Sequence, residues 1–78
     1  MPLIEFIKGV GIHIYNGEHR PPHLHASYNE FEVLIEIENS EIYAGYLPSR
    51  QMKIVLEWLK DNSKWALDVF YQLNPELA

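Results

Sequence analysis

The chain lacks cysteine altogether, which excludes disulfides and thiolate metal ligands. A chain without cysteine also fits a reducing compartment. The first residues show neither the basic start nor the apolar run of a secretory signal, and no stretch reaches the roughly 18 apolar residues of a membrane span. We therefore expect a cytoplasmic protein with no membrane association.

Basic residues are also scarce, with six Lys and Arg against 11 Asp and Glu and a formal net charge of −5. An acidic chain gains no net attraction from a phosphate backbone, which disfavours RNA as a partner without excluding a small local site. The hydrophobic content of 47% is too high for extensive disorder. A length of 78 residues is enough for one domain, which we place at residues 1–78.

The first half of the chain alternates apolar and polar residues with the period of β-strands. Two strands are predicted at residues 3–8 and 10–15, and a meander of three more follows at 23–28, 31–38 and 41–46. Asn29-Glu30 and Asn39-Ser40 are the expected hairpin turns. The pattern therefore predicts an antiparallel sheet of three to five strands.

Two-residue loops would set the register of this meander. The first loop places Leu24 opposite Ile35 and His23 opposite Glu36, so that apolar and polar residues separate onto two faces. The second loop places Ile37 opposite Ile42, Ile35 opposite Ala44, Val33 opposite Tyr46 and Glu36 opposite Tyr43. It also places Glu38 opposite Glu41, a pair that like-charge repulsion disfavours.

The second half of the chain has helical spacing. Two helices are predicted at about 49–61 and 63–73, separated near Asn62-Ser63 and ended by Asn74-Pro75. The expected fold class is α+β, with both helices packed on one face of the sheet. This arrangement leaves the face that carries the histidines uncovered.

The histidines are the residues with the most chemical potential. His23 and His25 lie two apart on a predicted strand, so both side chains point to one face with β-carbons about 6.6 Å apart. His19 lies four residues earlier, across Pro21-Pro22, and is placed to fold back toward them. Three imidazoles at this spacing suit Zn or another divalent transition metal, which gives His19, His23 and His25 as candidate ligands.

Two other interpretations of the same residues stay open. In the first, Glu36 orients His23 while His25 or His19 transfers a proton, so that His23, His25 and Glu36 are catalytic and act without a metal. In the second, the ring nitrogens only build the loop by bonding carbonyls next to the prolines, and His23 pairs with Glu36.

Two further sets of side chains are candidates for binding. Arg20 and Arg50 are candidate anion contacts, and Arg50 is poorly placed for the dipole of a helix that starts beside it. Ile54 and Trp58 form a second apolar stripe on the predicted helix. That stripe is a candidate partner-binding surface, with packing in the core as the alternative.

The stretch His19-Arg20-Pro21-Pro22-His23-Leu24-His25 resembles the signature of a small, mostly bacterial family, domain of unknown function 4160. Members have a Met-Pro opening, a His-x-Pro-Pro-His-aromatic-His loop, a Glu-rich strand, a Leu-Pro step and a Trp-bearing helix. This chain matches these features over nearly its whole length, at Met1-Pro2, Ile35-Glu36-Ile37, Leu47-Pro48, Arg50 and Leu56-Glu57-Trp58. It departs from them at Arg20, where asparagine is usual, and at Leu24, where an aromatic is common.

The resemblance implies a biological setting. Genes of this family often lie beside another small gene in a toxin–antitoxin-like arrangement, which implies a second small protein as the partner, with a homo-oligomer as the alternative. The function that the resemblance favours is therefore an interaction module in such a pair, with the histidine cluster as a candidate active or ligand site. Two alternatives stay open: a small histidine- or metal-dependent hydrolase acting on RNA, and a simple divalent-metal-binding protein.

Overall fold

A computed structural model describes residues 3–77 of the chain. Five strands follow one another in a single antiparallel meander, in the order β1 (Leu3–Ile7), β2 (Val10–His13), β3 (His23–Tyr28), β4 (Phe31–Glu36) and β5 (Ile42–Tyr46). The predicted antiparallel meander is therefore confirmed, and it extends to five strands. Met1 and Pro2, which contribute to the family resemblance, lie outside the described residues.

The register between β3 and β4 is the one that the two-residue turn predicts. Leu24 pairs with Ile35, Ala26 with Val33 and His23 with Glu36. The apolar members of these pairs are buried, so the separation of the two faces fixes the register, because a slip of one residue would turn every side chain to the wrong face.

The register between β4 and β5 differs from the prediction by one residue. Ala44 pairs with Leu34 rather than with Ile35, and the pairing shifts again before Ile42 meets Ile35. The turn is longer than two residues because the Glu36 amide donates to the Glu41 carbonyl at 2.8 Å, while Ile37 stays on the core face and its amide extends the pairing with β3 by donating to the Pro22 carbonyl at 3.0 Å. Glu41 therefore lies opposite Glu36 in the backbone pairing, in place of the predicted Glu38.

One continuous helix, α1 (Ser49–Leu73), follows the sheet, and a short 3-10 turn, η1 (Pro75–Leu77), ends the described chain. The prediction of two helices is wrong. No proline or glycine interrupts residues 49–73, and the Asn62 amide donates back to the Trp58 carbonyl at 2.9 Å instead of ending the helix. No helix within residues 3–77 is both long and apolar enough to cross a bilayer.

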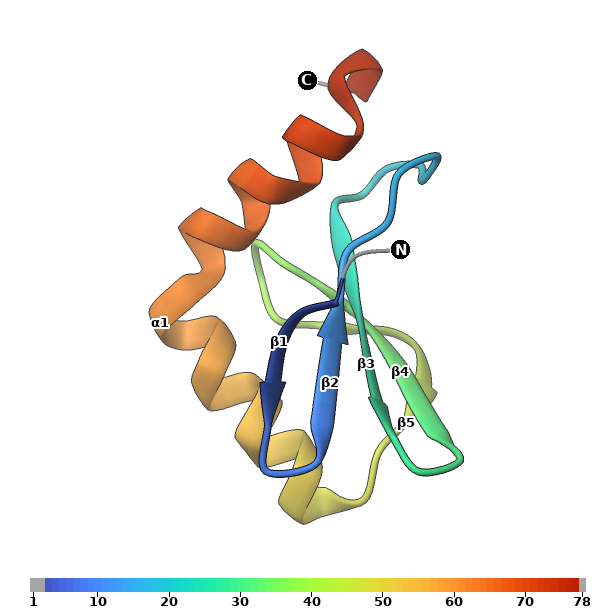
Figure 1. Cartoon of the computed structure of the whole chain (residues 1–78), viewed down its shortest axis with the longest axis vertical. Helices are drawn as coiled ribbons and strands as arrows, with labels where there is room; N and C mark the ends of the chain where they lie inside the picture. The colour runs from blue at the N-terminus through green and yellow to red at the C-terminus, as the bar shows by residue number, and fades with distance from the viewer. Residues whose placement is uncertain (1–2, 78) are drawn as a thin grey trace.

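Figure 1 shows α1 running obliquely along one side of the sheet. The helix buries Val55, Leu59, Ala66 and Phe70, which follow helical spacing. These side chains join inward-facing residues of the sheet, namely Val10, Ile12, Ile14, Leu24, Ala26, Val33, Ile35 and Ile37. The C-terminal end of α1 and the loop between β2 and β3 lie at the same end of the molecule (Figure 1). His19 lies on this loop, and His23 is the first residue of β3.

Gly45 is a position in β5 where the fold requires glycine. Its φ is +86°, and an added β-carbon would lie 2.3 Å from the Glu32 carbonyl oxygen. Gly45→Ala should therefore lower the free energy of unfolding by about 2 kcal/mol or more in urea denaturation. Gly17 is the matched control, because its φ is +75° but no atom lies within 4 Å of its added β-carbon. A cost for Gly45→Ala no larger than that for Gly17→Ala would show that the close approach of β4 and β5 does not matter.

Candidate metal centre

Strand β3 presents His23 and His25 side by side. The two rings have centroids 5.5 Å apart, as expected for residues two apart on one strand. Their surroundings differ, because His23 is 1% exposed and His25 is 16% exposed. The sequence predicted an uncovered surface for both, and for His23 this is wrong, since the rings of Tyr43 and Phe70 lie 5.5 and 6.0 Å from its ring.

The loop between β2 and β3 brings a carboxylate to both rings. Glu18 Oε1 lies 3.2 Å from His23 Nε2, and Glu18 Oε2 lies 3.1 Å from His25 Nε2. Each of the three residues offers a ligand atom, and these atoms all lie within 4.8 Å of one another. Among the described residues, this is the group of histidines and carboxylates whose geometry fits a shared ion.

The other nitrogen of each ring is also engaged. His23 Nδ1 lies 2.8 Å from the Pro21 carbonyl oxygen, and His25 Nδ1 lies 3.1 Å from Glu32 Oε2. Both partners accept hydrogen bonds, so each of these contacts needs a hydrogen on Nδ1. Metal-bound histidines are held in the same way, with the second ring nitrogen donating to a carbonyl or carboxylate.

This arrangement leaves too few hydrogens for the contacts that it contains. A neutral imidazole has one N–H, so it can supply a hydrogen to its Nδ1 contact or to its Nε2 contact with Glu18 at 3.1–3.2 Å, but not to both. Positive charge between the two rings and the carboxylate removes this conflict. Either each ring takes a second proton, or one divalent cation supplies the same charge to all three groups.

A second layer of side chains surrounds the three groups. The Tyr15 ring meets the His25 ring edge-on at 4.7 Å, and His13 stacks on Tyr15 at 5.8 Å. Partial burial lowers the pKa of His13 below the ordinary value for histidine, and the nearby His25 lowers that pKa further. Its surroundings therefore favour the neutral form of His13.

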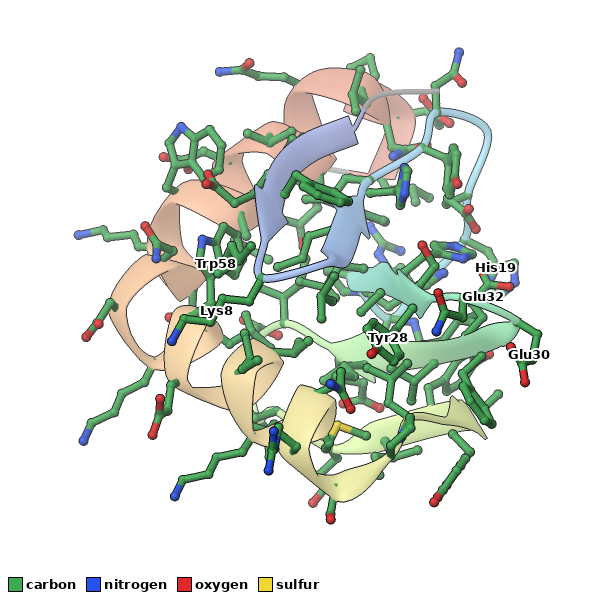
Figure 2. All side chains as sticks on the ribbon, turned by 60° about the horizontal axis from the view of Figure 1, so that its bottom comes forward. Lys8, His19, Tyr28, Glu30, Glu32 and Trp58 are labelled. Atoms are coloured by element: carbon green, nitrogen blue, oxygen red, sulfur yellow. The ribbon has the colours of Figure 1, made fainter. Side chains whose placement is uncertain are left out.

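The structure places the remaining predicted ligand and catalytic residues beside the cluster rather than in it. The exposed His19 has its Nδ1 on the Arg20 carbonyl oxygen at 3.1 Å and its ring 5.6 Å from that of His23. Glu36 is the cross-strand partner of His23 as predicted, but Nε2 of His23 contacts Glu18. Figure 2 shows His19 and Glu32 on the opposite side of the molecule from α1.

The predicted binding residues are dispersed. Arg20 donates from Nη2 to the Leu77 carbonyl oxygen at 2.6 Å, which joins the loop to η1. Arg50 lies exposed at the start of α1, at the other end of the molecule from the loop (Figure 1). Ile54 and Trp58 are half-buried, and the Trp58 ring packs edge-on against Trp65 at 6.2 Å.

Asn74, at the end of α1, holds the loop that carries Glu18. It is fully buried, its Oδ1 accepts from the Glu18 amide at 2.9 Å, and its Nδ2 donates to the Tyr15 and Phe70 carbonyls at 2.9 and 3.0 Å. The sequence placed Asn74 at a helix end, and nothing in its spacing indicated a bond to residues almost sixty positions away. Glu18 was missed for a related reason, because it lies on a loop outside the alternation of the strands.

Asn74→Ala should destabilise the fold by about 2–3 kcal/mol, because the Glu18 amide and the Tyr15 carbonyl lose their buried partner, while the Phe70 carbonyl keeps the backbone N–H of residue 74. Urea denaturation measures this loss. Asn62→Ala is the matched control, because Asn62 makes one hydrogen bond within α1 and alanine favours helix. We expect that control to change stability by less than about 0.5 kcal/mol. Equal effects of the two variants would contradict the role of Asn74 as the anchor of the loop.

Comparison with known proteins gives one match. The family model described as Domain of unknown function (DUF4160) matches residues 9–70, a range that includes the whole loop, all three clustered side chains and most of α1. No curated protein and no solved structure gives a significant match.

Proposed function

Because this chain belongs to the DUF4160 family, a domain family whose description assigns no activity, we propose its function from the cluster itself: Glu18, His23 and His25 bind one divalent transition-metal ion. The observation that carries this proposal is the pair of Nε2 atoms that face the two oxygens of one carboxylate at 3.1–3.2 Å. Ligands bonded to one metal at about 2.0–2.2 Å lie at separations close to these.

The donor set narrows the choice of ion. Two imidazoles and one carboxylate occur around zinc in hydrolytic enzymes and around Fe(II) in the facial triad of non-haem iron enzymes. Both kinds of site keep a coordination position for water or substrate. Here the open side faces solvent, because the side chains of His25 and Glu18 are 16% and 19% exposed.

The charges around the three proposed ligands limit the kind of substrate that the site could accept. Glu32 and Glu36 lie next to the cluster on β4, and the chain has no Lys or Arg between residues 21 and 49. This acidic setting disfavours cleavage of a phosphodiester backbone, which basic side chains attract. It favours a role in holding the metal, or in the hydrolysis of a neutral or cationic group.

A metal titration tests the proposal. The full chain, stripped with a chelator, is titrated with Zn²⁺ and, without oxygen, with Fe²⁺, and bound metal is counted by mass spectrometry. We expect one ion per chain, and loss of that ion in His25→Ala. A chain that binds neither ion, or that binds as well without His25, would leave the histidines with a structural role.

A further inference from the structure

Strand β5 is an exposed edge of the sheet. It lies at the end of the strand order, with β4 as its one neighbour. All five of its residues are exposed, and three of them are large and apolar: Ile42 at 57%, Tyr43 at 45% and Tyr46 at 62%. Proteins usually protect such an edge with charged residues, because an exposed apolar edge pairs with other strands.

The backbone of β5 has groups free for pairing. One side of the strand bonds to β4, and within residues 3–77 no other element bonds to the backbone of residues 42–46. The pairing shifts at Tyr43, so Ala44 to Tyr46 form the continuous ladder with β4, with Gly45 at a φ of +86°. An added strand would pair with the free backbone groups of this short stretch, which has Tyr43 and Tyr46 at its two ends.

The opposite edge of the sheet differs in charge. There β1 and its turn carry Glu5 and Lys8, both exposed, which is the usual protection of an edge. Residues 42–46 contain no charged side chain, although acidic residues surround them. Five glutamates and no Lys or Arg occur between residues 21 and 49, namely Glu30, Glu32, Glu36, Glu38 and Glu41.

We propose that β5 is the docking edge for an extended segment of a partner protein that is apolar at its centre and basic at its flanks. The free edge fits a strand, the exposed tyrosines and Ile42 fit an apolar centre, and the acidic rim attracts Lys and Arg beside it. A second copy of the chain fits less well, because it brings the same acidic face and the same net charge of −5. The Tyr43 ring lies 5.5 Å from the ring of His23, but no residue of β5 is among the three proposed metal ligands.

A designed peptide tests the surface by NMR titration of the isotope-labelled full chain. The probe, Lys-Lys-Thr-Val-Thr-Val-Thr-Lys-Lys, is compared with the same centre flanked by glutamates. The lysine peptide should shift the amide signals of residues 42–46, bind about 10-fold or more tightly than the glutamate peptide, and weaken with added salt. Equal binding of the two peptides, or shifts confined to other elements, would overturn the proposal.

Variants separate this edge from the rest of the surface. Ala44→Lys places a charge on the edge and should abolish binding of the lysine peptide, while Leu56→Lys, on the exposed side of α1, is the matched control and should bind normally. Replacing Glu38 and Glu41 together by lysine should reverse the preference toward the glutamate peptide. The dispersion of the amide signals verifies that each variant is folded. If Ala44→Lys does not fold, Tyr46→Ser takes its place as the variant that should weaken binding of the lysine peptide.

A second copy of the chain, the alternative occupant of the β5 edge, would give a different result. If the free chain sediments as a dimer, and Ala44→Lys makes it a monomer, then β5 is an interface between copies and the basic-partner proposal is wrong. Glu18→Gln should leave peptide binding unchanged, so failure of the metal centre and failure of the docking edge give different results.

Discussion

Glu18→Gln should lower the affinity of the chain for Zn²⁺ by more than about 100-fold, which exceeds the 10–100-fold typical of losing a residue that only supports a ligand. Glutamine has the shape of glutamate but no negative charge, and it replaces one oxygen with an amide that donates. One of the two Nε2 atoms would then face an N–H instead of a shared ligand. Competition with a chelator of known affinity measures the change.

His19→Gln is the matched control for this result. His19 is a histidine of the same loop whose ring lies 5.6 Å from that of His23, but the three-ligand site does not use it. We expect its replacement to change the affinity by less than about 3-fold, well below the effect of a supporting residue. A loss as large as that of Glu18→Gln would instead establish His19 as a ligand, as the sequence suggested.

Phe70→Ala should destabilise the fold by about 3–5 kcal/mol, the range for emptying a phenylalanine site in a core. Phe70 is fully buried on the core face of α1, and its ring lies 6.0 Å from that of His23. It also lies one turn before Asn74, whose amides bond to its carbonyl. Thermal and urea unfolding measure the loss, and the cost is large for a chain of 78 residues.

Leu67→Ala is the matched control for the core prediction. Leu67 lies on α1 within one turn of Phe70, but it is only partly buried at the margin of the core. Its replacement should cost about half as much or less, because the loss scales with the apolar surface removed from the interior. Similar costs for the two variants would mean that α1 does not pack on the sheet through the face that carries Phe70.

The parts of the fold that the sequence predicts correctly are those in which one face is buried. In β3 and β4 the apolar residues alternate with polar ones, apart from Leu34, and the observed register buries Leu24, Ala26, Val33 and Ile35 on one face. Strand β5 has the same alternation in sequence, but all its residues are exposed. Burial of side chains from β5 therefore does not select between two registers, and the turn closed by the bond from the Glu36 amide to the Glu41 carbonyl sets the observed one.

The helix α1 shows a different reason why a prediction from sequence fails. Asn62-Ser63 has the composition of a break, but both residues are tolerated inside a helix when neighbouring turns pack. The buried residues on either side, Leu59 and Ala66, are seven apart and so lie on the same face of one helix. Periodicity across the supposed break was a better guide than the local composition.

The candidate site was half predictable. The spacing of His23 and His25 on one strand places both on one side, and the structure brings them together. Glu18 reaches them through a loop, and Asn74 holds that loop from the far end of the chain. Contacts of this kind leave no period in the sequence, so the predicted carboxylate was the cross-strand Glu36 instead of Glu18.

The position of a bound metal tests the central claim most directly. Crystals of the zinc-loaded full chain, measured at the zinc absorption edge, should show one anomalous peak at about 2.0–2.2 Å from Nε2 of His23, Nε2 of His25 and a carboxylate oxygen of Glu18. A peak on His13 or His19 alone, or no peak while both Nε2 atoms still face Glu18, would contradict it.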